Sequence, residues 1–314
     1  MQAGISRSPA RKIQLRLGWT QLMLVCLGVL LWSCSAKPVL VNIKGYEQAV
    51  PVDTILDAAA GRTIAFEDLV DQLARVQVVY VGERHTLPAH HAFQRRVIEA
   101  LVQRGTLKQV GMEMFDHTYQ AKLDKWVEGH WDWPEFIRLT HWYANWGFDD
   151  SLYQEILESV RKHKLRLVGL NIPFCLPPKI ATGGLASLSD QEKALLPEKI
   201  DTGNPDHRDY VQAIYARHGS MLKGREVFEY FYEAQCAWED GMASAVAGHA
   251  ADGQMVVLAG NGHIIRKFGI PDRAHNRMEV PFLTVYLAQP GEEIATGDAD
   301  FIWIAPSMSV HNRM

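Results

Sequence analysis

The chain has 314 residues, of which 47% are hydrophobic and 22% are charged, a composition typical of a globular protein with ample chain for a sizeable core. Its formal net charge of −4 argues against a nucleic-acid partner, because such partners are bound by basic surfaces. The four cysteines form no Cys-x-x-Cys pair, which argues against a zinc cluster.

Residues 1–34 are predicted to be a targeting leader. A basic start is followed by the apolar run 22–32, which is short for a membrane span and typical of a signal peptide. The run leads to Cys34 in a setting that resembles a bacterial lipobox, although Trp32 stands where a small residue is preferred. We expect lipidation of Cys34, with ordinary signal cleavage or a retained anchor as alternatives. Ser35 resembles the signal for transfer to the outer membrane, so the mature chain would be tethered by lipid.

Residues 35–52 are expected to be a linker, and residues 53–314 a single α/β domain. Within this domain, Pro88 is suited to the first turn of an amphipathic helix. His90 and His91 fall in that first turn, where either one of them reaches back to the crevice or, as we favour, their side chains are exposed.

Two short motifs with the same pattern stand far apart in the chain. Residues 78–85, VVYVGERH, predict a buried strand that runs into a tight turn. Residues 256–263, VVLAGNGH, repeat the pattern of two valines, two further apolar residues and Gly-x-x-His. In an open parallel sheet, ligands bind in a crevice beyond the carboxyl ends of the strands. We therefore expect Glu83, His85 and His263 to point into one such crevice.

Further polar residues are expected to join this crevice. Residues 108–115 predict a short strand that contains Glu113, and a carboxylate is costly to bury without a partner. Glu113 therefore either lies at the strand tip facing the crevice, which we favour, or is paired with a cation. On a long helix predicted over residues 225–251, Gln235 and Glu239 lie one turn apart on the same face and are expected to support the crevice.

The remaining elements indicate the fold class. Strand and helix signals alternate, which predicts a three-layer α/β fold with a mainly parallel sheet flanked by helices and a smaller helical subdomain. The helical insertion is expected at about 119–147, where aromatic residues either pack on the sheet or wall a planar ligand. A loop-rich segment is expected at about 172–206. Cys175 and Cys236 either pair or remain buried free thiols, and we favour free thiols.

The chemistry of the predicted crevice has three interpretations. Imidazoles and carboxylates suit a divalent metal with a water nucleophile, or metal-free acid–base catalysis, or a structural polar network. No Gly-x-Ser-x-Gly nucleophile motif is present. The sequence thus leaves open whether the protein is an enzyme and favours a binding role. The candidate catalytic or metal-binding residues are Glu83, His85, Glu113 and His263.

Several sequence blocks, in order, resemble the ChaN-like family of bacterial haem-binding lipoproteins. They are VVYVGERHTLPAHHAFQ, GMEMFDHTYQAKLDKW, WGFDDSLY, GLNIP, the pair His218-Gly219, AQCAWEDGMA and VVLAGNGHI. Glu239 stands where the family usually has Asp. The paired Gly-x-x-His signatures also resemble a wider superfamily that includes Tiki/TraB-type metalloproteases and erythromycin esterases, so fold alone does not decide catalysis.

The resemblance implies a lipid-anchored protein of the outer membrane, facing the periplasm, that serves haem or iron uptake. It also implies a homodimer that holds two cofacial haems, each with its iron bound by a tyrosine, a hard anionic ligand suited to ferric iron. A metal-dependent hydrolase acting at the crevice is the alternative. The candidate haem-binding residues are Tyr143, Tyr153, Tyr210, Tyr215, His207 and His218.

Overall fold

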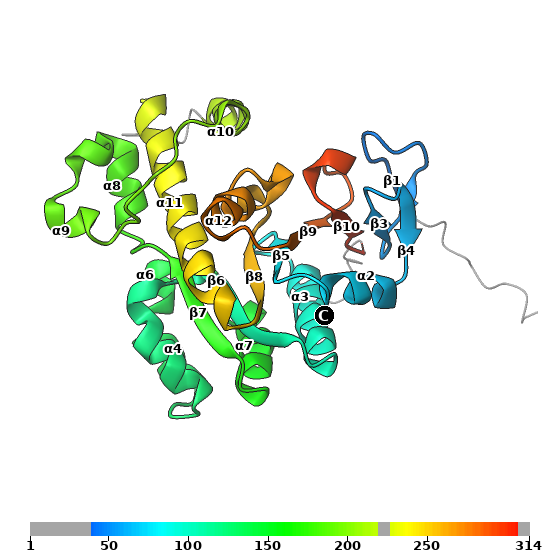
Figure 1. Cartoon of the computed structure of the whole chain (residues 1–314), viewed down its shortest axis with the longest axis horizontal. Helices are drawn as coiled ribbons and strands as arrows, with labels where there is room; N and C mark the ends of the chain where they lie inside the picture. The colour runs from blue at the N-terminus through cyan, green and yellow to red at the C-terminus, as the bar shows by residue number, and fades with distance from the viewer. Residues whose placement is uncertain (1–38, 219–226, 307–314) are drawn as a thin grey trace, which may run out of the picture. The chain divides into compact units, whose positions relative to one another are not determined.

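The computed structural model describes residues 39–218 and 227–306, so Cys34 and the predicted leader lie outside the described part. Its centre is an eight-stranded sheet with the order β4-β3-β10-β9-β5-β8-β6-β7 (Figure 1). The neighbours from β10 to β7 pair in parallel, whereas β3 runs antiparallel to both β10 and β4. The predicted α/β class with a mainly parallel sheet is confirmed. The sheet strands are β3 (Ile55–Asp57), β4 (Arg62–Ile64), β5 (Val78–Glu83), β6 (Leu107–Asp116), β7 (Arg166–Asn171), β8 (Gln254–Gly260), β9 (Phe282–Ala288) and β10 (Phe301–Ile304).

Helices cover both faces of the sheet, because the central strands are apolar on both sides. In β5, Val79 and Val81 pack into one core cluster with side chains of α2, α3, α4 and α7, whereas Val78 and Tyr80 pack against α11 and α12. Successive residues of a strand point to opposite faces, which explains this division. The helices are α2 (Phe66–Leu73), α3 (Pro88–Gln103), α4 (Gln120–Val127), α5 (Trp133–Leu139), α6 (Trp142–Asn145), α7 (Ser151–Lys162), α8 (Leu176–Gly183), α9 (Asp190–Lys193), α10 (Pro205–His218), α11 (Phe228–His249) and α12 (Ile270–Met278).

The expected linker over 35–52 is folded where it is described. Residues 39–52 form a hairpin in which β1 (Leu40–Val41) pairs antiparallel with β2 (Val50–Pro51). Val41, Ile43 and Val50 of this segment are buried in a cluster with side chains of β9 and β10. The expectation of a linker from residue 39 onward is therefore wrong, because alternate apolar residues attach the hairpin to the sheet.

Two other segments differ in detail from the expectations. The segment 172–206, predicted to be loop-rich, contains α8 and α9, and buried residues such as Ile180 hold it against α11. Cys175 and Cys236 are both free thiols, as favoured, but Cys175 is exposed rather than buried. In the part of the chain that the structure describes, no helix has the length and apolarity needed to cross a membrane.

Two glycines of α11 offer a matched test of its packing. A Cβ atom on Gly241 would lie 2.3 Å from Cγ2 of Ile172, whereas nothing lies within 4 Å of a Cβ on Gly248. We expect Gly241→Ala to lower the free energy of unfolding by about 1–3 kcal/mol through overpacking. Gly248→Ala should raise it by up to about 1 kcal/mol, since alanine is the better helix former. Urea denaturation measures both, and equal effects of the two variants would contradict this account.

Candidate functional site

The two Gly-x-x-His turns lie side by side. Strands β5 and β8 are parallel neighbours in the sheet, with Gly82 opposite Ala259 and Glu83 opposite Gly260. After β8, residues Asn261–His263 form a short 3-10 helix, η5. The two turns therefore lie next to each other, as predicted, at the carboxyl ends of adjacent central strands.

Glu83 organises the first turn. Its carboxylate is buried, and it accepts hydrogen bonds from the Tyr153 hydroxyl at 2.6 Å and from Nε2 of Gln94 at 2.9 Å. Nδ1 of His85 lies 2.7 Å from the same carboxylate. Burial opposes a charge on His85, but the hydrogen bond to Glu83 and the charge of Glu113 outweigh it and raise the pKa of His85. The imidazole is thus held in one orientation as an ion-pair partner.

His90 and His91 also belong to this turn, and the expectation that they are exposed is wrong. Both are buried, because α3 begins directly against the end of the sheet. The backbone N–H of Arg84 donates to Nδ1 of His90 at 2.9 Å, and Nε2 of His91 lies 3.1 Å from the carbonyl oxygen of His85. Burial lowers the pKa of His90 to about 4, so its ring is a neutral acceptor at physiological pH.

Glu113 and His263 connect the second turn to the sheet. Strand β6 continues past Glu113, but its neighbour β8 ends at Gly260, so the carboxylate reaches the crevice from inside β6. Glu113 accepts a hydrogen bond from the Gly260 N–H at 2.7 Å and lies 3.4 Å from Nε2 of His263. Both alternatives proposed for Glu113 therefore hold, since it faces the crevice and is paired with a cation.

His263 lies between two carboxylates. Its Nδ1 is 3.3 Å from Oε1 of Glu239, opposite the contact with Glu113. Burial opposes its charge, but Glu113 and Glu239 outweigh this effect and raise the pKa of His263 to about 10. Burial likewise opposes the charge of Glu239, whose pKa is nevertheless lowered by His207, His263 and Arg273. The predicted support from α11 is present, because Nε2 of Gln235 donates to Glu239 at 2.8 Å.

His207 is part of this buried network rather than of an open ligand site. Its Nε2 lies 3.0 Å from Oε2 of Glu239, and its Nδ1 lies 3.3 Å from the Tyr232 hydroxyl. Nε of Arg273 is 3.4 Å from the same Glu239 oxygen. Both ring nitrogens of His207 therefore have a polar neighbour inside the protein. We call Glu83, His85, Glu113, His263, Glu239, His207 and Arg273 the ion network.

The ion network does not fit the divalent metal of the alternative hypothesis. Its imidazoles and carboxylates are directed at one another, and within residues 39–218 and 227–306 no group of three or more His, Cys, Asp and Glu is arranged to hold a metal ion. The arrangement corresponds to the third interpretation of the sequence, a polar network that holds the loops.

The four candidate tyrosines lie in different environments. Tyr153 is fully buried and donates its hydroxyl to Glu83, so it is not accessible to a ligand. Tyr143 of α6 is 60% exposed, and its hydroxyl donates to Asp150. Tyr215 packs against Phe228 and Phe231. The side chain of His218, the last residue of α10, lies outside the described part.

Tyr210 lines a wide groove of about 1680 Å³ that is open to solvent. The groove lies between α10, the loop from β1 to β2, the turn after β5, the short 3-10 helix η6 (Ile265–Lys267) and residues 292–298. The Tyr210 ring packs 6.3 Å from that of Phe268. Burial, with the charges of Glu239 and Asp298, raises the pKa of Tyr210 to about 12, while Arg266 and Arg217 act in the opposite direction.

The charged residues of the groove were not singled out from the sequence. Arg266 pairs with Asp298, whereas Lys44, Arg84 and Arg217 form no ion pair with any described residue. Nothing in their sequence neighbourhoods distinguishes Lys44 and Arg217 from other charged residues. Arg84 alone could have been noticed, because it lies inside the first Gly-x-x-His motif.

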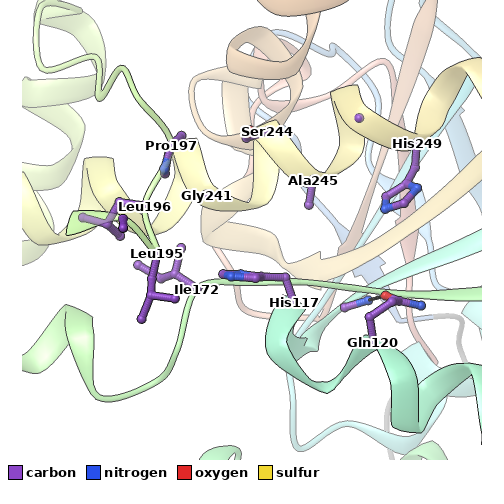
Figure 2. A pocket seen from close by; sticks show the side chains of 13 residues that line it. His117, Gln120, Ile172, Leu195, Leu196, Pro197, Gly241, Ser244, Ala245 and His249 are labelled. Carbon is purple, nitrogen blue, oxygen red and sulfur yellow. Dashed lines mark hydrogen bonds between the residues drawn. The ribbon is translucent and has the colours of Figure 1, made fainter. Parts of the chain in front are cut away.

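A second cavity, of about 380 Å³, lies between α11 and the edge of the sheet (Figure 2). The small residues Gly241, Ser244 and Ala245 of α11 form one wall, and His117 and Gln120 face them. Gln120 satisfies backbone groups of the edge strand β7, because its side-chain amide donates to the Leu167 carbonyl and accepts from the Gly169 N–H. None of the predicted site residues is among the described residues that line this cavity.

A family model and one solved structure with a TM-score above 0.5 agree with the fold. A family model described as "Haem-binding uptake, Tiki superfamily, ChaN" matches residues 69–274. A structure of ChaN of Campylobacter jejuni, described as showing cofacial heme binding, is 22% identical over 79% of this chain and 95% of that chain, with a TM-score of 0.66. An erythromycin esterase mutant in its open conformation is 16% identical over 76% of each chain, with a TM-score of 0.46. A type III effector is 14% identical over 76% of this chain and 91% of that chain, with a TM-score of 0.43. No curated protein matches the chain.

Proposed function

Because this chain belongs to the ChaN family of haem-binding uptake proteins in the Tiki superfamily, we propose that it binds haem and serves haem or iron uptake. The family membership supports this function, and the groove at the carboxyl ends of the strands supports its location. A binding role also agrees with the ion network, in which the described imidazoles and carboxylates face one another.

The observation that carries the proposal is Tyr210 in the open groove. Haem would supply a ferric iron in a flat apolar ring that bears two carboxylates. Tyr210 would ligate the iron, since a phenolate is a hard anionic donor. Burial, Glu239 and Asp298 raise the pKa of the Tyr210 hydroxyl, and Arg266 and Arg217 offset only part of this rise, while Phe268 offers an apolar surface beside the ring. Within the groove, tyrosine, cations and apolar side chains therefore fit the chemistry of the group.

We assign the haem to an interface between two copies of the chain. The groove is open to solvent, so a planar ligand lying against Tyr210 would keep one face uncovered. A second copy related by two-fold symmetry would cover that face with its own groove. Cofacial heme binding is described for ChaN of Campylobacter jejuni, and the similarity of that protein to this chain supports such an arrangement.

The proposal includes a lipid anchor. Cys34 in its lipobox-like setting would carry the lipid, and Ser35 would direct the protein to the outer membrane, facing the periplasm. This part rests on the sequence alone.

The test is a titration of the full chain, purified in mild detergent, with hemin, followed by size-exclusion chromatography. We expect a saturable Soret shift at about one haem per chain, together with a haem-dependent shift to a dimer. Weak, non-saturating absorbance would overturn the proposal. Saturation without dimerisation would retain haem binding and remove the second copy.

A further inference from the structure

Two of the cations that line the groove belong to elements other than α10. Lys44 lies in the loop between β1 and β2, and Arg84 lies in the turn between β5 and α3. Both side chains are exposed, and neither forms an ion pair or a hydrogen bond with another residue of 39–218 or 227–306. Both residues therefore line the groove, and their charges are not paired with another described residue.

The backbone of each cation is nevertheless held in place. The Arg84 N–H donates to the buried His90 ring at 2.9 Å. The Lys44 N–H donates to the Ile294 carbonyl at 2.8 Å, and its own carbonyl accepts from the Thr296 N–H at 2.9 Å. Positions fixed in this way lose less conformational freedom when a ligand binds.

The acidic residues of the groove come from two segments, residues 292–298 and α10. In the segment 292–298, Asp298 is paired with Arg266, and Glu292 accepts a hydrogen bond from the Tyr286 hydroxyl. Glu293 of the same segment is exposed. Asp206 and Asp209 belong to α10, as Tyr210 does, and lie beside the proposed iron ligand. Lys44 and Arg84 thus belong to elements of the groove other than α10, which carries Tyr210, Asp206, Asp209 and the third unpaired cation, Arg217.

We propose that Lys44 and Arg84 form a carboxylate-binding edge that holds the propionates of a tetrapyrrole ligated by Tyr210. This inference rests on the proposed function and adds the ligand class, which is a metal porphyrin with free carboxylates. Arginine binds a carboxylate with two parallel hydrogen bonds, and lysine contributes a point charge. An ester of the same porphyrin keeps the ring and the iron but loses the charge that these residues recognise.

The test compares hemin with hemin dimethyl ester on the full chain in mild detergent. We expect the wild-type protein to bind hemin about tenfold more tightly than the ester, because the ester cannot form charge-assisted hydrogen bonds with Lys44 and Arg84. Lys44→Gln combined with Arg84→Gln should weaken hemin binding to the level of the ester and leave ester binding unchanged. Arg62→Gln, which removes one exposed positive charge on the edge strand β4, is the control and should preserve the preference.

The outcomes separate this inference from the proposed function. Saturable hemin binding with equal affinity for the ester would overturn the carboxylate edge and leave haem binding intact. Retention of the preference by the double variant would also overturn it. Absence of saturable hemin binding by the wild-type protein would remove the proposed function and this inference together. The wild-type comparison of the two ligands needs no variant, so it stands even if the double variant fails to fold.

Discussion

Replacement of Tyr210 by phenylalanine is expected to abolish haem ligation while leaving the fold intact. The change removes only the hydroxyl, which makes no hydrogen bond to another described residue, and it keeps the ring beside Phe268. Loss of an outer-sphere partner of a metal typically costs 10–100-fold in affinity, so loss of the ligand itself should cost at least about a hundredfold. The measurements are the Soret titration and the phenolate-to-iron charge-transfer band, and both signals should disappear.

Tyr143→Phe is the matched control for this prediction. It makes the same chemical change at a more exposed tyrosine, on α6, which does not line the groove. Hemin affinity should remain that of the wild-type protein. If Tyr143→Phe lost the charge-transfer band and Tyr210→Phe kept it, the haem would lie on the helical segment at 119–147, and the groove would be the wrong site.

Glu239→Gln is expected to lower the free energy of unfolding by about 3–5 kcal/mol, the cost of breaking a buried ion pair. The Glu239 side chain is 1% exposed and contacts His207, His263 and Arg273. Its neutral replacement would leave the buried His207 without a carboxylate partner and would remove one of the two carboxylates beside His263 and Arg273, which keep Glu113 and Asp240. Urea denaturation followed by circular dichroism measures the effect.

Glu229→Gln, on the same helix α11, is the control for this prediction. The Glu229 side chain is 60% exposed and pairs with Arg208, which is the geometry of a surface ion pair. Such pairs contribute at most about 1 kcal/mol, so this variant should be nearly as stable as the wild-type protein. An effect of Glu239→Gln no larger than that of Glu229→Gln would show that the ion network does not stabilise the fold.

The local patterns of the sequence were sufficient to predict the sheet and the meeting of its two motifs. The Val-Val runs before Gly82 and Gly260 form β5 and β8, and these strands are neighbours. Glu83, His85 and His263 accordingly reach one end of the sheet. These features follow from the two-residue period of a strand and from the rule that places polar turns at the carboxyl ends of parallel strands.

Burial at the ends of elements was not predictable in the same way. His90 and His91 have the sequence signature of an exposed helix start, yet both are buried, because the first turn of α3 packs against the end of the sheet. The hairpin at 39–52 has strands too short to give a periodic signal, and its apolar residues are buried only because β9 and β10 are adjacent. In both cases long-range packing decides what the local pattern does not specify.

The sequence by itself therefore determined the α/β class, the two Gly-x-x-His turns and the family resemblance, because each is encoded in residues close together in the chain. Only the tertiary structure decided that His207 and Arg273 join Glu239, and that Lys44, Arg84 and Tyr210 line one groove. These residues come from segments far apart in the sequence, and each is unremarkable in its own neighbourhood. Their proximity results from the way the strands and helices pack, which cannot be predicted from the short-range periodicity of the sequence.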